Sequence, residues 1–315
     1  MLTDCLSCGG TVAPDGFCWD CGAEQPDFRA HLEITLTSPT TPSDPPTTER
    51  PTASGRRMAD QHTAHPPVPG QSTANCGPGH MLGAGVSDRG KRRGRNADAM
   101  ALATARTWTI GVVCDGISMS PRPERAAQVA AETGTSALAS ALRADVLPED
   151  ALTQSAIRAA RAVAALATSV RAAPACTYVA AIAGQDGIWA CWIGDSRAYW
   201  LPDEGTAMAL TEDDTGAHDA LSAWLGADAQ APEPRIRSYR PRGPGRLLLC
   251  TDGLWRHLPP APALRPGHGD LLQDARNLVG TALDAGGHDN ITALLIQVQG
   301  IEPGNDQTKS RHGFR

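Results

Sequence analysis

Two apolar runs in this sequence each end in an acidic residue that glycine follows. Residues 247–251 (LLLCT) lead into Asp252, and residues 110–114 (IGVVC) lead into Asp115. Short apolar runs bounded by turn residues are typical of strands buried in a sheet. If both strands end at the same sheet edge, mutual repulsion disfavours ionising both carboxylates unless a cation binds them. The sequence therefore predicts a metal site at the ends of two buried strands.

The composition limits the class of protein. With 315 residues, 41% of them hydrophobic, the chain can bury one substantial core and leaves room for a small second domain. The net charge of -6 argues against a nucleic-acid partner, and residues 91–95 are the one local basic run. No run approaches the roughly 18 apolar residues of a membrane span, and the N-terminus lacks the pattern of a secretory signal. We expect a globular, cytoplasmic protein with no membrane or nucleic-acid partner.

Residues 1–30 contain two Cys-x-x-Cys pairs, each followed by glycine. The four cysteines are Cys5, Cys8, Cys18 and Cys21. Four thiolates at this spacing suit a tetrahedral structural Zn²⁺, so this segment is predicted to be a zinc ribbon that serves docking or assembly; two redox-active pairs are the alternative. Residues 31–79 are rich in proline, threonine and serine and are predicted to be a disordered linker, and residues 301–315 a flexible tail.

The remaining segment, residues 80–300, is predicted to alternate strands with helices. One helix is expected from Pro123 to Arg143. A second should start at Pro148 and continue through Ile157, Val163, Leu166 and Val170, which recur at near-helical spacing. A third is expected over 217–225, after a segment that contains Thr211 and whose acids Asp213 and Asp214 would cap it. Six strands are expected at 177–183, 188–194, 197–201, 235–239, 246–251 and 291–298, with a hairpin turn at Asp186-Gly187.

Three more acids stand at predicted strand ends. Asp98 precedes the apolar residues 99–102, Asp195 lies between two strand candidates, and Asp289 comes just before the last strand. Five carboxylates in such positions exceed what a fold needs. Magnesium and manganese prefer oxygen ligands of this kind.

Six motifs occur in an order that identifies a family resemblance. They are Arg-Asn-Ala-Asp at 95–98, Asp-Gly at 115–116, Gly-Asp-Ser-Arg at 194–197, Leu-Thr-Glu-Asp-Asp at 210–214, Asp-Gly-Leu-Trp at 252–255 and Gly-His-Asp-Asn at 287–290. With them, residues 80–300 resemble the bacterial branch of the metal-dependent type 2C protein serine/threonine phosphatases, the PPM family. The resemblance implies an α+β fold: an αββα sandwich of two antiparallel sheets flanked by helices.

The resemblance also implies a binuclear Mn²⁺ or Mg²⁺ site. Asp115 would bridge two ions, with the Gly116 carbonyl on one and Asp252 and Asp289 on the other. Two bridged cations lower the pKa of a shared water, which would attack the phosphorus of phosphoserine or phosphothreonine. Asp195 would join Asp252 at a third, weaker metal position. The expected partners are phosphorylated proteins, including a bacterial Ser/Thr kinase or its substrates.

A phosphate-binding arginine is expected five residues before Asp98, which is Arg93. Its guanidinium offers two parallel donors to two phosphate oxygens. Arg92 and Arg95 compete for this role, and a solvated basic loop is the remaining interpretation. Asp98 itself is expected to belong to the catalytic set, and His257 or His288 could serve as a general acid.

Two positions depart from the family pattern. Ala97 stands where a glutamate or glutamine is usual, and Arg256 stands where an acid often supports the third metal. The central acids remain, which favours an active enzyme. The alternative is a catalytically weak or inactive protein of the same fold that binds phosphoproteins or acts as a scaffold.

Overall fold

The computed structural model describes residues 8, 10, 20–21, 30–38, 81–267 and 269–299. The chain divides into two units, Met1–Leu36 with Met81–Arg315, and Thr37–His80; the description below concerns the first. Cys5 and Cys18 lie outside the described residues, as do the predicted tail and most of the predicted linker. Cys8 and Cys21 are exposed. The zinc ribbon therefore stays a prediction.

A five-stranded antiparallel sheet forms the centre of one half of the fold. Its order is β11-β7-β6-β4-β3, and the strands are β3 (Asp98–Ala105), β4 (Trp108–Asp115), β6 (Tyr178–Gly184), β7 (Gly187–Ile193) and β11 (Arg235–Tyr239). Strands β6 and β7 form the predicted hairpin. Gly187 adopts a φ of +140° there, which favours glycine.

A six-stranded sheet packs against the first, in the order β1-β2-β13-β12-β8-β9. Its strands are β1 (His31–Thr37), β2 (Met81–Asp88), β8 (Arg197–Pro202), β9 (Met208–Ala209), β12 (Gly245–Cys250) and β13 (Ile291–Val298). A separate two-stranded sheet pairs β5 (Ala175–Cys176) with β10 (Leu225–Gly226). Each of the six strands expected between residues 177 and 298 is present with bounds shifted by at most one residue, and the predicted run 110–114 lies within β4.

Strand β1 occupies residues 31–37, where the disordered linker was predicted to begin. Leu32, Ile34 and Leu36 occur at every second position, which is the period of a strand. Ile34 packs against the core between the two sheets. This contact stabilises residues 31–37 as an edge strand, so the prediction of disorder is wrong for them.

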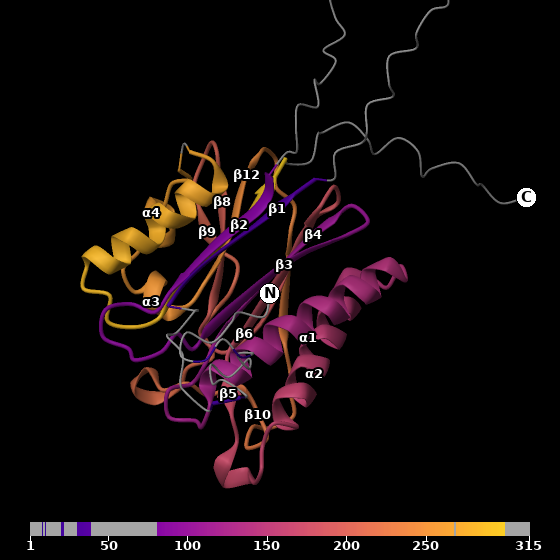
Figure 1. Cartoon of the computed structure of the whole chain (residues 1–315). Coiled ribbons are helices and arrows are strands. Elements are labelled where there is room, and N and C mark those ends of the chain that lie inside the picture. Colours follow the sequence, from indigo (N-terminus) through magenta and orange to yellow (C-terminus); the bar gives the residue numbers. More distant parts are fainter. Residues whose placement is uncertain are drawn as a thin grey trace, which may run out of the picture. The chain divides into compact units, whose positions relative to one another are not determined.

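Helices cover the outer face of each sheet (Figure 1). Helices α1 (Pro123–Arg143) and α2 (Pro148–Ala164) lie on the five-stranded sheet, and α3 (Asp252–Trp255) and α4 (Leu271–Asp284) lie on the six-stranded one. Both long helices begin with proline, as predicted. None of the described helices is long and apolar enough to span a bilayer.

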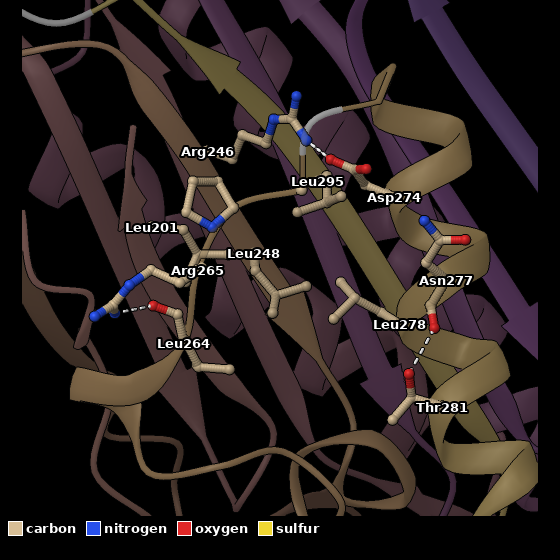
Figure 2. A pocket seen from close by; sticks show the side chains of 12 residues that line it. Leu201, Arg246, Leu248, Leu264, Arg265, Asp274, Asn277, Leu278, Thr281 and Leu295 are labelled. Carbon is tan, nitrogen blue, oxygen red and sulfur yellow. Dashed lines mark hydrogen bonds and ion pairs between the residues drawn. The ribbon is translucent and has the colours of Figure 1, made fainter. Parts of the chain in front are cut away.

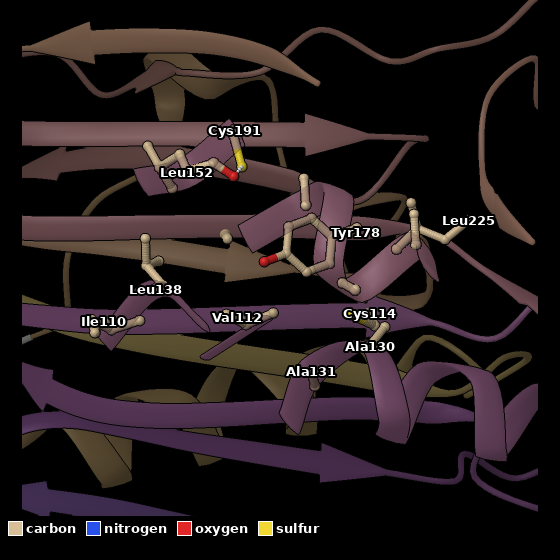
Figure 3. Packing of buried hydrophobic residues seen from close by; sticks show 14 of the residues in the cluster. Ile110, Val112, Cys114, Ala130, Ala131, Leu138, Leu152, Tyr178, Cys191 and Leu225 are labelled. Carbon is tan, nitrogen blue, oxygen red and sulfur yellow. Dashed lines mark hydrogen bonds between the residues drawn. The ribbon is translucent and has the colours of Figure 1, made fainter. Parts of the chain in front are cut away.

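Three buried clusters join these four layers. The first fills the space between α1, α2 and the five-stranded sheet, where Tyr178 points toward the helices (Figure 3). Its hydroxyl lies 2.7 Å from Ser155 Oγ, which donates to the carbonyl of Gly134 on α1. The second cluster lies between the sheets, and the third lies under α4. The αββα sandwich is therefore confirmed.

Two helical predictions were wrong in part. Helix α2 ends at Ala164, and Ser169 is already extended with a φ of -162°. Leu166 and Val170 therefore do not continue its buried face, and Val170 is 67% exposed. The helix expected over 217–225 is a single 3-10 turn at Ala217–Asp219, because the following residues extend toward β10 and its pairing with β5.

A pocket of about 150 Å³ lies between α4 and β12 (Figure 2). Arg246 of β12 forms an ion pair there with Asp274 of α4, and their side chains are 12% and 4% exposed. Arg246 lies at the beginning of β12, whereas Asp252 follows its end. The pocket and the predicted acidic site are thus at opposite ends of this strand.

Candidate functional site

Four of the five predicted acids line one cleft of about 210 Å³. They are Asp115, Asp195, Asp252 and Asp289, and Arg93 lines the same cleft. Asp115 ends β4, Asp252 begins α3 directly after β12, and Asp289 precedes β13. The antiparallel order of the strands places these ends together. The structure thus brings to one place acids separated by up to 174 residues, from 115 to 289 in the sequence.

Asp98, the fifth acid, is buried beside this cleft. It is the Cα partner of Asp115 across β3 and β4, and it is 5% exposed. Its Oδ2 accepts hydrogen bonds from Thr251 Oγ1 at 2.8 Å and Thr292 Oγ1 at 2.7 Å. Its Oδ1 is buried and has no hydrogen-bond partner among the described residues. One carboxylate oxygen of Asp98 therefore accepts two hydrogen bonds, and the other is left to accept one from a ligand.

Burial, together with the charges of Asp252 and Asp289, raises the pKa of Asp98 to about 7, against the lowering effect of the two hydroxyl donors. Thr251 and Thr292 were not predicted to belong to the site. Both are fully buried, and each stands at the end of an apolar strand next to a predicted ligand segment. A hydroxyl residue at the end of such a run is the signal that could have identified them.

Asn290 holds the loop that carries Arg93. Its Nδ2 donates to the carbonyls of Arg89 at 2.8 Å and Arg95 at 2.9 Å, and its Oδ1 accepts from the Ala97 amide at 2.8 Å. These three bonds connect the segment before β13 to the loop before β3. Asn290 thereby fixes the position of the loop that carries Arg93.

Asp115 and Gly116 form a tight corner at the cleft. The Asp115 amide donates to Thr177 Oγ1 at 3.0 Å. Burial raises the pKa of Asp115 well above its usual range, and the neighbouring carboxylates, Asp98 first, raise it further. A Cβ on Gly116 would lie 2.5 Å from the carbonyl oxygen of Pro123. Only glycine fits this corner, so packing requires the glycine that follows the predicted metal ligand Asp115.

Arginines neutralise two of the acids. Arg93 donates from Nε to Asp289 Oδ1 at 2.7 Å and from Nη2 to Oδ2 at 2.6 Å. Arg256 Nε lies 3.1 Å from Asp252 Oδ2. Among the described residues, no group of three or more histidine, cysteine, aspartate or glutamate side chains is already arranged to hold a metal ion. Of the three candidate arginines, Arg93 is the one that lines the cleft.

Trp255 and Arg197, which were not predicted to belong to the site, hold the backbone at Asp195. Trp255 Nε1 donates to the Asp195 carbonyl at 2.8 Å, and the Arg197 guanidinium lies 3.5 Å from the centre of the Trp255 ring. Arg197 also donates to both carboxylate oxygens of Asp213, at 2.8 and 2.7 Å. Burial and the charge of Asp252 raise the pKa of Asp195 to about 6.

The capping role predicted for Asp213 and Asp214 was wrong, and Thr211 beside them is also bonded elsewhere. Thr211 Oγ1 accepts from the Ala198 amide at 3.0 Å, and Asp214 Oδ2 accepts from the Gly194 amide at 2.9 Å. With the Asp213 ion pair, these bonds attach the segment to the ends of β7 and β8 rather than to a helix. Their partners lie at least 13 residues away, so local spacing could not reveal them.

Neither predicted histidine lines the cleft. His288 is exposed and His257 is partly buried. The general-acid role expected of one of them therefore has no geometric support in the described part of the chain.

The residues of the cleft fit hard divalent cations. The donors are carboxylate and carbonyl oxygens, which magnesium and manganese prefer. Mutual repulsion and burial raise the pKa values of Asp98, Asp115, Asp195 and Asp252, and a bound cation would relieve that repulsion. The unpartnered Asp98 Oδ1 is a further acceptor.

Comparison with known proteins gives matches in sequence and in fold. The serine/threonine phosphatase stp of Listeria innocua is 29% identical over 150 residues, which cover 41% of this chain and 59% of that protein. The chain thus matches less than two thirds of that relative's length. A bacterial serine phosphatase crystal structure has a TM-score of 0.59 at 21% identity, covering 71% of this chain and all of the other.

A third similar protein is the catalytic domain of the serine/threonine phosphatase PstP, whose structure was determined with two manganese ions. It is 25% identical, with a TM-score of 0.53, and the match covers 69% of this chain and 98% of that domain. The family profile described as protein phosphatase 2C matches residues 88–281, which include every acid of the cleft except Asp289. This match spans more than half of the sequence, and the chain belongs to the protein phosphatase 2C family.

Proposed function

We propose that this protein is a metal-dependent protein serine/threonine phosphatase that hydrolyses phosphoserine and phosphothreonine. The observation that carries the proposal is the single cleft lined by four carboxylates and Arg93. The serine/threonine phosphatase activity named for the Listeria relative and the two manganese ions in the PstP domain support it. The substrates are phosphorylated proteins, including a bacterial Ser/Thr kinase or its targets.

Asp115, the Gly116 carbonyl, Asp252 and Asp289 would hold two Mn²⁺ or Mg²⁺ ions, and Asp195 with Asp252 a third, weaker one. When bound, such ions stabilise charge on the phosphoryl group and lower the pKa of water at the site. No covalent phosphoenzyme is required.

The chain's own residues have two further tasks. Arg93, which already presents two parallel donors to a carboxylate, would bind two oxygens of the substrate phosphate in the same way. Asp98 has a pKa of about 7 and one unpartnered oxygen, so it can accept a proton at Oδ1 and release it near neutral pH. The four N-terminal cysteines would bind one structural Zn²⁺, which metal analysis of the purified chain can count.

Hydrolysis of a small aryl phosphate tests the proposal directly. We expect activity that depends on added manganese and falls at least about 100-fold in Asp252→Asn, because a ligand carboxylate is lost. Asp186→Asn is the matched control, since Asp186 is an exposed Asp-Gly acid in a hairpin turn. Activity without metal, or activity that survives Asp252→Asn, would contradict the mechanism. Inactivity with metal bound would favour the phosphoprotein-binding alternative.

A further inference from the structure

An apolar groove of about 270 Å³ adjoins the acidic cleft. Ile117, Met119, Pro121, Val170, Leu221 and Trp224 supply its apolar lining, and Arg171 and Asp228 are charged residues beside it. Ile117 and Leu221 also line the cleft that contains Asp115 and Asp252. The two depressions therefore lie side by side and share part of their walls.

Apolar side chains in this groove are unusually exposed. Met119 is 94% exposed and Val170 is 67% exposed, and they are the two most exposed large apolar side chains in the described part of the chain. Single exposed apolar residues are ordinary on protein surfaces. Two of them beside one groove at the mouth of a polar site are typical of a surface that contacts a partner.

Hydrogen bonds hold the Met119 side of the groove in place. The Ile117 amide donates to the Ala175 carbonyl at 2.9 Å, and the Ala175 amide donates to Ser120 Oγ at 3.1 Å. The Ser120 amide donates to the Ile117 carbonyl at 2.8 Å, which closes a turn around Met119. This turn continues directly from Asp115 and Gly116, so the groove and the predicted metal ligands share one fixed segment.

The opposite side of the groove is fixed in a similar way. Leu221 forms a β-bridge with Thr215, and the Ser222 amide donates to the Asp214 carbonyl at 2.8 Å. Trp224 Nε1 donates to Asp228 Oδ1 at 3.1 Å. With the polar end of Trp224 satisfied, its ring can present an apolar surface to a ligand. The groove is therefore preformed, as binding sites for apolar groups usually are.

We propose that this groove binds an apolar side chain of the substrate polypeptide, close in sequence to the phosphorylated serine or threonine. The proposal rests on the phosphatase function proposed above. An extended chain advances roughly 3.3–3.6 Å per residue, so the side chain would come from about two to four residues away from the phosphorylated one. Leucine, isoleucine, methionine and valine suit the lining, whereas a charged or small polar side chain leaves it uncovered.

The test compares phosphothreonine peptides that carry leucine or serine at each position two to four residues before and after the phosphothreonine. With the manganese-loaded full chain, we expect kcat/KM to be about 10-fold higher for leucine at one or more of these positions, as for other apolar pockets. The Met119→Ser/Val170→Ser double variant should lose this preference. It should hydrolyse a small aryl phosphate at the wild-type rate, because that substrate does not reach the groove.

The control is Met208→Ser, an exposed methionine on β9 that does not line the groove and should keep the preference. Equal rates for leucine and serine peptides at every position, or a preference that persists in the double variant, would overturn the proposal. If the wild-type chain fails to hydrolyse the aryl phosphate, the proposed function fails instead. Fluorescence anisotropy then measures whether the same peptides bind in the groove. Binding of a leucine peptide that is about 5- to 10-fold tighter supports the proposal, and equal binding of the leucine and serine peptides overturns it.

Discussion

Asp98 and Asp115 face each other as Cα partners at the open end of the β3–β4 hairpin. One is buried against two threonine hydroxyls, and the other lines the acidic cleft. Burial raises the pKa of Asp115 most, and among the neighbouring charges that of Asp98 raises it most. This pairing concentrates negative charge beside the proposed metal site.

The metal-free protein should lose stability as pH rises from about 4 to about 7. The folded-state pKa values of Asp98, about 7, and Asp195, about 6, lie above the unfolded value of roughly 3.9, so the folded state retains protons that the unfolded state releases. Stability is therefore highest below pH 4 for these groups and falls until both are ionised. Thermal unfolding with a chelator at pH 5 and pH 8 measures this difference. Manganese should reduce it, and Asp98→Asn should flatten the profile; a metal-free protein that is more stable at pH 8 would contradict the assignment.

Arg93→Ala should change substrate and metal affinity in opposite directions. Arg93 pairs with both oxygens of Asp289, so it competes with a cation for that carboxylate. Its loss should tighten manganese binding, measured by calorimetry, while it raises KM for a phosphate monoester about 10-fold or more. Arg92→Ala is the control, because Arg92 is exposed and does not line the cleft. An unchanged KM would mean that Arg93 does not bind the phosphate.

Thr292→Val should act through Asp98. The substitution nearly preserves volume but removes a hydroxyl that donates to Asp98 Oδ2 at 2.7 Å and lowers the pKa of that carboxyl. We expect the acidic limb of the kcat–pH profile to move to higher pH and kcat at pH 7 to fall about 3- to 10-fold. Thr104→Val, near the other end of β3, should leave the profile unchanged. A loss of activity without a shift of the profile would indicate only a packing defect.

Two glycine-to-alanine substitutions in helices should have opposite effects on stability. A Cβ at Gly134 in α1 would lie 2.4 Å from the Tyr178 hydroxyl, whereas nothing lies within 4 Å of a Cβ at Gly280 in α4. Gly134→Ala should cost about 1–3 kcal/mol of unfolding free energy through overpacking. Gly280→Ala should add about 0.5–1 kcal/mol, because alanine favours the helix. Denaturant unfolding measures both, and equal effects would contradict the close packing of Gly134 against Tyr178.

Periodicity and turn residues were sufficient to predict most of the elements. The strands around Asp115 and Asp252 and the hairpin at Asp186 depend on neighbours in the chain, and an apolar run that stops at Asp-Gly is informative by itself. The predictions for residues 31–37 and 217–225 were wrong. The first become a strand because they pair with β2, and the second are drawn into extended structure beside β10.

The contacts that define the cleft depend on packing between distant segments. Arg93 meets Asp289 across 196 residues, Thr292 reaches Asp98 across 194, and Trp255 holds the Asp195 carbonyl across 60. Local patterns carry no information about such pairs, because their geometry arises only when two sheets are packed face to face. The sequence is therefore enough to predict which acids gather at the cleft, whereas the folded sandwich decides which of them are buried, which are paired with arginine, and which hydroxyls hold them.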